Sequence, residues 1–424
     1  MLDARKVKAE KPRNIKRRNQ KAIVALLQNN TEMTIPEIAE RLELSRTSAT
    51  QIVNELCKEK VLKKVGTRDA TTAGGKPPRV FSMNASFRYT IIVTIGNDFI
   101  SCNISNMKCR VIQKRVRDIA DISKWNGWNL AMEVTVAEVR LLLKESGIRK
   151  EQICMMVVAC GGVVDRKRGV CMFPIGTKRR NDFPVCEFLR TELQFSFPII
   201  IDNVGRFLGY AELLEDPSLN HKTVAALFMH SAGSVGGCVI EKGELLYGRH
   251  GYQGEFGHLL VETHQGRACV CGNDGCLESM TSPESLRAIW KKHEAAYPSA
   301  ILDRRKAGDI REVFREANGG NPLARVMVDE FAVYVARAIY NIVLMYDPQQ
   351  IILQGLLAYG GEYFEKKLND LVRIFPSYGN AETGIVTYSK ISNSDGGFIT
   401  GAALYALNTC LFGDKYKYLF DKEQ

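Results

Sequence analysis

One histidine and three cysteines constrain the fold of this chain more than any other feature. His258 closes the motif Gly254-Glu-Phe-Gly-His258, and the cysteines follow in Cys269-Val-Cys271-Gly-Asn-Asp-Gly-Cys276. One imidazole and three thiolates form a soft tetrahedral ligand set of the kind that Zn²⁺ prefers, and the glycines allow the loop to turn tightly around one ion. Because protein ligands fill all four positions, the sequence predicts a structural zinc ion held by His258, Cys269, Cys271 and Cys276.

Two other interpretations of this cluster stay open. The cysteines could be buried thiols that lie close together by chance, in which case no metal would bind. His264 could replace His258 as the nitrogen ligand, although it lies in the expected loop with no obvious partner. Only the first alternative would leave this segment without a metal cross-link.

The overall composition is that of a cytosolic globular protein with two or three domains. The chain has 424 residues, of which 45% are hydrophobic and 25% charged. No apolar run approaches the roughly 20 residues that a membrane helix needs, and the first residues lack the apolar segment of a secretory signal. We therefore expect a cytoplasmic protein with no membrane partner. Its twelve cysteines should stay reduced there, which favours metal over disulfides.

Almost all of the excess positive charge lies in the first fifth of the chain. The formal net charge is +11; residues 1–90 contain 19 Lys and Arg against 9 Asp and Glu, which leaves 39 against 38 for the rest. A small basic unit joined to a nearly neutral body suggests that the small unit binds a polyanion.

The basic unit has the sequence pattern of a winged helix-turn-helix. Apolar residues at helical spacing predict a first helix over residues 19–28. Thr34, with Pro36 and Glu37 after it, is a capping-box start for a second helix, and the hydroxyl of Ser45 can cap a third. Two short strands with a basic turn between them, residues 61–65 and 80–84, would form the wing. We therefore predict a DNA-binding domain over residues 1–84.

In the third helix one face is apolar and the polar side chains gather at the N-terminal end, where a recognition helix contacts base edges. The predicted DNA contacts are these side chains and two basic residues of the wing: Arg46, Thr47, Thr50, Gln51, Lys76 and Arg79. The competing interpretation is that three short amphipathic helices merely present a solvated, charged face.

From residue 85 onward, strands alternate with helices, which indicates an α/β body. We expect strands at 90–98, 99–107, 153–165, 197–204, 223–230, 238–246 and 347–357, and helices at 123–147, 204–215 and 335–346. No short-period repeat or low-complexity segment interrupts them.

Together, the EFGH motif, the CVCGNDGCLE segment, a Gly-rich strand turn and the preceding winged helix resemble the ROK family of bacterial repressors, open-reading-frame proteins and sugar kinases. The resemblance implies an actin/hexokinase-like body of two α/β lobes with a sugar between them. The first lobe would comprise 85–204 with about 390–424, and the second 205–389. A ROK body with a winged helix implies a sugar-responsive transcriptional regulator.

The resemblance also implies a sugar-binding site. Residues that match family positions holding sugar hydroxyls are Asn203, Glu255, His258 and Glu278. Carboxylates, an amide and an imidazole offer directional hydrogen bonds to a polyol, and a site built from such groups rejects ligands that leave them unpaired. The alternative is that Glu255 and Glu278 only support the zinc ligands.

Three departures from the kinase pattern argue against catalysis. Kinase members have an Asp directly after the Asn, where it takes the proton of the attacking hydroxyl; here Val204 stands there and cannot accept a proton. The phosphate-binding turn reads Thr94-Ile-Gly-Asn-Asp98 and sets a negative charge where phosphates would lie. The later turns, 231–237 and 354–356, have fewer glycines than kinases do. Asp202 is the one carboxylate that a shift of register would bring to the Val204 position.

We therefore predict a sugar-sensing repressor without catalytic residues, which binds an inverted-repeat DNA operator as a homodimer or dimer of dimers. A ROK-type ATP-dependent sugar kinase with an added DNA-binding module is the alternative. A constitutive DNA-binding protein whose body only dimerises is a third possibility. The sequence leaves open the identity of the sugar, its phosphorylation, the operator and the direction of the response.

Overall fold

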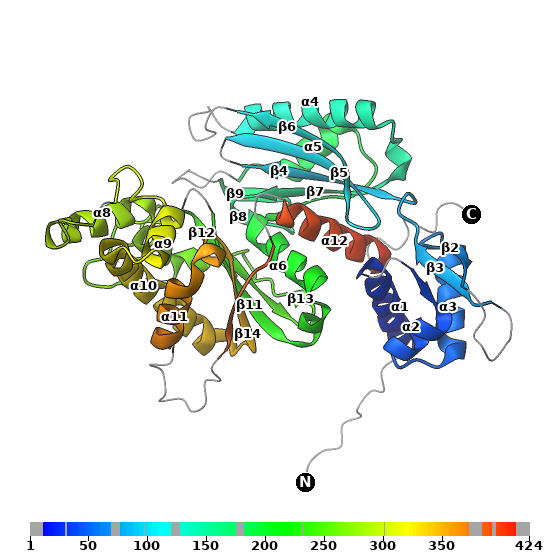
Figure 1. The fold of residues 1–424 in the computed structure, drawn as a ribbon. Helices are drawn as coiled ribbons and strands as arrows, with labels where there is room; N and C mark the ends of the chain where they lie inside the picture. The colour runs from blue at the N-terminus through cyan, green and yellow to red at the C-terminus, as the bar shows by residue number, and fades with distance from the viewer. Residues whose placement is uncertain are drawn as a thin grey trace, which may run out of the picture.

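The computed structural model describes residues 12–29, 32–68, 77–96, 98–119, 128–174, 182–230, 233–300, 302–372, 384–391 and 396–412. Figure 1 shows a small N-terminal unit beside a larger body that contains two five-stranded sheets. In this part of the chain no helix is both long and apolar enough to span a membrane.

The N-terminal unit is a winged helix. Three helices, α1 (Pro12–Asn29), α2 (Ile35–Arg41) and α3 (Arg46–Lys58), pack against a sheet of order β1-β3-β2. Its strands are β1 (Met33–Thr34), β2 (Leu62–Thr67) and β3 (Arg79–Met83). The predicted caps are confirmed: Thr34 and Glu37 form a capping box at α2, and the Ser45 hydroxyl accepts the Ser48 N–H at α3. Three details differ: α1 starts at Pro12 rather than near residue 19, the short strand β1 is not among the predicted elements, and β2 extends to Thr67.

The first sheet of the body has the order β10-β7-β4-β5-β6. Its strands are β4 (Tyr89–Ile95), β5 (Phe99–Asn106), β6 (Val111–Asp118), β7 (Ile153–Cys160) and β10 (Ile199–Asn203). Helices α4 (Trp128–Ser146) and α5 (Val185–Leu193) cover one face. Along β4, Ile91 and Val93 belong to the hydrophobic cluster on that side, and Ile92 belongs to the cluster on the other, as strand alternation requires. A hairpin, β8 (Gly162–Asp165) and β9 (Val170–Pro174), follows β7.

The second sheet has the order β13-β12-β11-β14-β15. Its strands are β11 (Thr223–Met229), β12 (Val235–Glu241), β13 (Glu244–Leu245), β14 (Gln350–Gly355) and β15 (Val386–Tyr388). A helical layer packs on it and fills the far end of the molecule in Figure 1: α7 (Leu277–Met280), α8 (Pro283–His293), α9 (Ile310–Asn318), α10 (Pro322–Tyr346) and α11 (Gly361–Val372). Short 3₁₀ turns lie at 150–152, 217–221, 256–258, 294–296 and 356–359.

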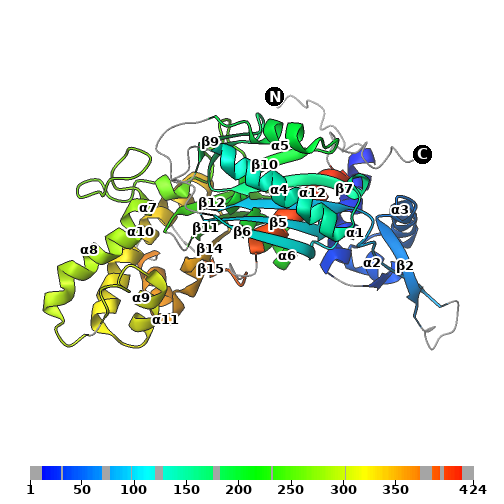
Figure 2. The ribbon, with the colours of Figure 1, turned by 90° about the horizontal axis from the view of Figure 1, so that it is seen from above.

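Two helices connect the sheets. Helix α6 (Val204–Glu215) follows β10 directly, and α12 (Gly397–Phe412) packs along it. The two backbones approach so closely that a Cβ added at Gly401 would lie 1.7 Å from the Phe207 carbonyl oxygen. In Figure 2, which views the molecule from above, α12 and α6 lie beneath the first sheet. Position 401 therefore requires glycine for packing rather than for backbone freedom.

The winged helix and the body share one hydrophobic cluster. Ile23 and Leu27 of α1 belong to the same buried cluster as Met107 and Cys109 of the turn after β5 and Phe412 of α12. Lys21 lies over the Phe412 ring, 5.9 Å from its centroid, and its Nζ is 3.4 Å from the Glu244 carboxylate at β13. The N-terminal unit is thus packed against the body.

The predicted strands and helices of the body are present in the predicted order, but the structure contains others and some bounds differ. The elements that are not among the predicted ones are strands β6, β9 and β15 and helices α5, α7, α8, α9, α11 and α12. Strand β12 begins at Val235, so Gly236 and Gly237 are strand residues and not part of a turn. The helix expected over 335–346 begins at Pro322, where Asn321 caps it.

Candidate functional site

The predicted metal ligands lie together. His258 ends the 3₁₀ turn Phe256–His258, and the three cysteines come from the following loop and the start of α7. The four ligand atoms lie within 4.8 Å of one another; Cys271 Sγ is 3.5 Å from Cys276 Sγ, and Cys269 Sγ is 3.5 Å from His258 Nδ1. Zn–S bonds of about 2.3 Å place tetrahedral sulfur ligands about 3.8 Å apart. The donor set and its spacing therefore fit a Zn²⁺ ion.

Gly275 shows why the loop needs glycine. Its φ is +80°, and a Cβ there would lie 1.8 Å from the Glu262 carbonyl oxygen. Val261 N and Glu262 N both donate to the Gly275 carbonyl, which ties the segment after His258 to the residue before Cys276. The backbone thus brings the first and last ligands together. His264, the competing nitrogen ligand, does not belong to the four-residue group.

Asn203, a predicted sugar ligand, also serves the fold. Its Oδ1 accepts the Gly205 N–H at 2.8 Å, which caps α6, and its Nδ2 donates to the Gly162 carbonyl at 2.8 Å. The neighbouring Val204 is the first residue of α6. The Asn203 amide therefore lies at the junction of β10, β8 and α6, and its nitrogen and its oxygen each already make one hydrogen bond.

The predicted acids Glu255 and Glu278 come from different elements of the second sheet's layer. Glu278 Oε2 accepts the Val235 N–H at 2.9 Å. Within the described residues, no side chain or backbone group is hydrogen-bonded to the Glu255 carboxylate. Burial raises the pKa of Glu255 to about 7; the Arg206 guanidinium opposes that rise and the Glu278 carboxylate adds to it. Two acids and an arginine thus lie within electrostatic reach of one another.

Gly237 connects these acids to Asn203. A Cβ added at Gly205, next to the Asn203 cap, would lie 3.5 Å from the Gly237 nitrogen. One added at Gly254, next to Glu255, would lie 2.4 Å from the Gly237 carbonyl oxygen, and Gly254 has a φ of +87°. Strand β12 therefore runs between the start of α6 and the EFGH motif, so the segments that carry Asn203 and Glu255 both pack against Gly237.

Next to this site is a buried ion pair that the sequence alone does not reveal. Arg206 and Asp202 are each only 2% exposed, and Arg206 Nη1 lies 2.5 Å from Asp202 Oδ1. Tyr247 Oη donates to Asp202 Oδ2 at 2.9 Å. Asp202 lies at the end of β10 and Arg206 lies four residues later in α6. The sequence can indicate this pairing only if the residue at which α6 begins is already known. Asp202 therefore faces this network and not the Val204 position.

The predicted phosphate turn is only partly within the described residues. Thr94 lies in β4, where its hydroxyl is buried with no hydrogen-bond partner among the described residues, and Asp98 is exposed just before β5. Burial lowers the pKa of His230, which follows β11, and the negative charge of the Asp98 carboxylate opposes that shift. Asn97 and residues 231–232 lie outside the described residues.

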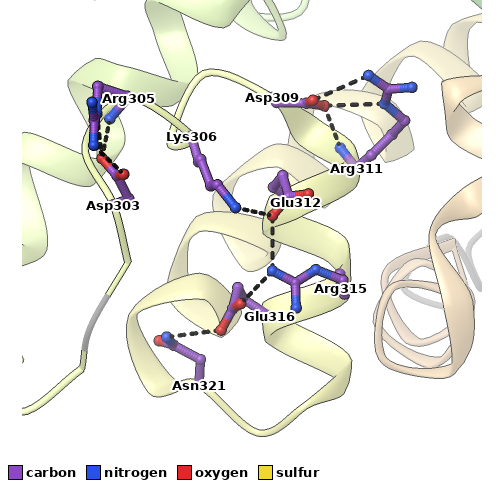
Figure 3. Close-up of polar contacts among 9 residues, drawn as sticks. All are labelled: Asp303, Arg305, Lys306, Asp309, Arg311, Glu312, Arg315, Glu316 and Asn321. Atoms are coloured by element: carbon purple, nitrogen blue, oxygen red, sulfur yellow. Dashed lines mark hydrogen bonds and ion pairs between the residues drawn. The ribbon is translucent and has the colours of Figure 1, made fainter.

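The later turns border a cavity of about 250 Å³. Its wall includes Gly233, Pro283 and Leu356 and the arginines Arg287, Arg305 and Arg311. Each arginine has an acid close by in sequence: Arg305 pairs with Asp303 and Arg311 with Asp309, as Figure 3 shows, and Arg287 pairs with Glu284. The cationic rim is therefore largely neutralised by the chain itself.

In the winged helix, the predicted base-contacting residues lie on the first turns of α3. Arg46, Thr47 and Gln51 are exposed, while the Thr50 hydroxyl donates to the Arg46 carbonyl at 2.7 Å. Gln51 Nε2 donates to Glu55 Oε1 at 3.3 Å, so it is held along the helix. Arg79 is exposed at the start of β3, opposite Thr67. Lys76 lies outside the described residues.

Two further lysines extend the basic surface. Lys63 and Lys64 are exposed on β2, where they pair with Ser82 and Phe81. Together with Arg79 they line an open hollow of about 410 Å³ between β2 and the end of α3. The two adjacent lysines in the sequence could have indicated this basic surface. The sequence predicts a strand over residues 61–65, but its lysines are not among the predicted DNA contacts.

Comparisons with known proteins agree with this architecture. The ROK family model matches residues 104–408, and a model described as winged helix-turn-helix DNA-binding matches residues 16–63. The xylose repressor of Bacillus spizizenii is 21% identical over 370 residues, which cover 87% of this chain and 90% of that protein. A solved ROK family transcriptional regulator, described as a homologue of the E. coli MLC protein, superposes with a TM-score of 0.75 at 18% identity over 96% of this chain and 99% of that one.

A ROK family glucokinase from Streptomyces griseus, solved with glucose and AMPPNP, superposes with a TM-score of 0.58 at 21% identity. That match covers 98% of the glucokinase but only 74% of this chain. The part of this chain that the glucokinase does not cover is about the size of the N-terminal unit. Since the ROK model spans well over half of the sequence and a winged helix-turn-helix model matches the segment before it, the chain belongs to the ROK family and has an N-terminal winged helix.

Proposed function

We propose that this protein is a sugar-responsive transcriptional regulator that represses genes for sugar or glycan use. The observation that carries the proposal is the packing of a basic winged helix against a ROK body through one hydrophobic cluster. A ligand that changes the position of one body sheet relative to the other would move α6 and α12, which connect the sheets. The winged helix, which packs against α12, would move with them. Such a ligand shifts DNA affinity because it binds one arrangement better than the other.

The proposed parts are a DNA-binding unit over residues 1–84 and a body over 85–424. The first lobe comprises 85–204 with about 390–424, and the second comprises 205–389. The two sheets and the position of α12 support this division. Pairing of two bodies in a homodimer or a dimer of dimers would present two winged helices to an inverted-repeat operator.

On this proposal the sugar binds between Asn203, Glu255, His258 and Glu278. The free carboxylate of Glu255 supports a role in accepting hydrogen bonds from hydroxyl groups. The zinc ion is a structural cofactor held by His258, Cys269, Cys271 and Cys276; it cross-links the loop that carries the site and supplies binding free energy to folding. The convergence of Asn203 and Glu255 on Gly237 supports one shared ligand site.

The proposal includes the absence of kinase activity. Val204 cannot accept a proton, and the buried Asp202 is committed to Arg206 and Tyr247. The cavity of about 250 Å³ beside Gly233 and Leu356 is a structural observation that favours the alternative, an ATP-dependent sugar kinase with a DNA-binding unit. A coupled assay of ATP consumption across a sugar panel separates the two, because sugar-dependent turnover would establish the kinase.

The DNA-binding part is tested by selecting sequences from random double-stranded DNA with the full-length protein. We expect an inverted repeat to be enriched and protected from nuclease. Addition of the effector sugar should change the protected fraction. Enrichment of no sequence, with equal binding by an Arg46→Ala, Thr47→Ala double variant, would contradict the proposal.

A further inference from the structure

The loop before Glu255 depends on contacts from outside itself. It follows β13 and covers residues 246–254. Arg206, on the first turn of α6, supplies the bonds: its Nη2 donates to the Gly251 carbonyl at 2.7 Å and to the Gln253 carbonyl at 3.0 Å. One guanidinium therefore holds the half of the loop that leads into Glu255.

The same arginine is tied to the other end of the loop through Asp202. Arg206 Nη1 donates to Asp202 Oδ1 at 2.5 Å, and Tyr247 Oη donates to Asp202 Oδ2 at 2.9 Å. The backbone N–H of Asn203 donates to Oδ1 at 2.8 Å. A buried charge pair is tolerated when its remaining donors and acceptors find partners, and here the loop supplies three of them: the Tyr247 hydroxyl and the Gly251 and Gln253 carbonyls.

The loop is also pressed against the β8–β9 hairpin and against the second sheet. A Cβ added at Gly251 would lie 2.2 Å from the Val164 carbonyl oxygen of β8, and Gly251 has a φ of +80°. At Gly254 the corresponding contact is with Gly237 of β12. Because the loop packs tightly against β8 and β12 and leads directly into Glu255, a small displacement of the loop also displaces the Glu255 side chain.

We propose that Arg206 is a positioning residue for ligand recognition: it fixes loop 246–254 and so places the Glu255 carboxylate against the ligand. This rests on the proposed sugar site. Three observations support it, namely the two carbonyl bonds, the bridge through Asp202 to Tyr247, and the position of Glu255 directly after the held segment. Arg206 does not contact the ligand itself.

Arginine is required because one planar group must reach three acceptors. A lysine at position 206 keeps the charge opposite Asp202, but a single ammonium on a flexible stem cannot reproduce the fixed fork. Arg206→Lys should therefore retain the ion pair and release the loop. Its matched control is Arg140→Lys, because Arg140 Nη2 also donates to a carbonyl, that of Glu192, at 2.7 Å, but on the exposed side of the first lobe.

The test is amide hydrogen exchange of the full-length protein, followed in peptides that cover residues 246–256. We expect Arg206→Lys to speed exchange there by about tenfold or more and Arg140→Lys to leave it unchanged. If Arg206→Lys fails to fold, the double variant Asp202→Leu, Arg206→Met removes both charges of this pair together, so that neither partner is left without the other. Unchanged protection of the loop in a folded variant would overturn the proposal.

A second measurement separates positioning from a merely structural role. Sugar binding is followed by thermal shift with D-xylose, D-glucose and N-acetyl-D-glucosamine. For a sugar that stabilises the wild type, we expect Arg206→Lys to raise the half-maximal concentration by about tenfold and the control to leave it unchanged. A loosened loop with an unchanged half-maximal concentration would overturn the proposal. Stabilisation of the wild type by none of the sugars would count against the proposed function, while the exchange result still decides whether Arg206 holds the loop.

Discussion

Asn203 Nδ2 lies 2.8 Å from the carbonyl oxygen of Gly162, so the first residue before α6 is hydrogen-bonded to the first residue of β8. The same side chain caps α6 through its Oδ1, which accepts the Gly205 N–H. A cap needs only the acceptor, whereas the bond to Gly162 needs the donor. The two functions of Asn203 can therefore be separated by substitution.

Asn203→Asp should keep the cap and lose the bond to Gly162, because a carboxylate faces the carbonyl with no proton to donate. We expect the free energy of unfolding to fall by about 1–3 kcal/mol, the cost of leaving a buried polar group unpaired. Denaturant unfolding at neutral pH measures this. At a pH low enough to protonate the new carboxyl, the loss should shrink; a loss that does not depend on pH would contradict the explanation.

The exposed lysines of β2 should contact DNA phosphates. Lys63→Gln and Lys64→Gln should weaken binding to all sequences and reduce the slope of log K against log salt by about 0.9 for each phosphate that the protein no longer neutralises. Arg46→Ala should instead relax the choice of sequence by about 1–3 kcal/mol per contacted base. Titrations over a range of salt concentrations test both, with Lys144→Gln on α4 as the control. An unchanged salt slope in both β2 variants would exclude Lys63 and Lys64 from the interface.

One zinc ion per chain should depend on Cys271. Cys271→Ser should lose the metal and lower the melting temperature of the body, since the free energy of metal binding is part of the free energy of folding. Cys57→Ser, on α3 and outside the cluster, should retain it. Elemental analysis after purification without chelators gives the metal content. A fully folded wild type without zinc would refute the prediction.

Sugar binding and catalysis should separate. We expect no ATP turnover with any sugar, and Val204→Asp should remain inactive or nearly so because the turn that ends in Asp98 still opposes phosphate. Glu255→Ala should abolish the sugar response of DNA binding and leave binding without sugar intact. Glu284→Ala, an exposed acid, is its control. Turnover by the unmodified protein would establish the kinase alternative.

Stability should fall with rising pH through Glu212. This α6 residue is buried, which raises the pKa of its carboxyl, while hydrogen bonds from Ser389 and Gln354 oppose the rise. A carboxyl whose pKa is higher in the folded state contributes stability at low pH and loses it as the pH rises through that value. Glu212→Gln removes the titration. Its melting temperature relative to wild type should therefore increase from pH 5 to pH 8; parallel curves would contradict this.

The parts of the structure that the sequence predicts well are the local ones. Thr34 and Ser45 mark helix starts because a cap uses residues within one turn. The cysteine cluster is equally local, since a short loop holds three of its ligands. Residues whose role depends on distant partners escape such prediction: Arg206 binds carbonyls of Gly251 and Gln253, and nothing near Arg206 in the sequence points to them.

Strand β6 escapes prediction for a different reason. It is an edge strand whose residues are nearly all exposed, so VIQKRVRD has no regular alternation of apolar and polar positions. Its exposed Val111, Ile112 and Val116 would suit a buried face, but Lys and Arg interrupt them. Burial on one face is what creates the period-2 signal, and this strand has little of it.

The hydrophobic cluster that joins Ile23 and Leu27 of α1 to Phe412 of α12 limits how such a regulator can evolve. A DNA-binding unit transplanted from a relative would bring the wrong side chains to the end of α12 and leave apolar surface uncovered on both parts. New operator specificity must therefore arise by substitutions on the exposed turns of α3, or by exchange of α1 together with α12. Although most of the chain separates α1 from α12, a substitution on one of these two helices should therefore require a matching change on the other.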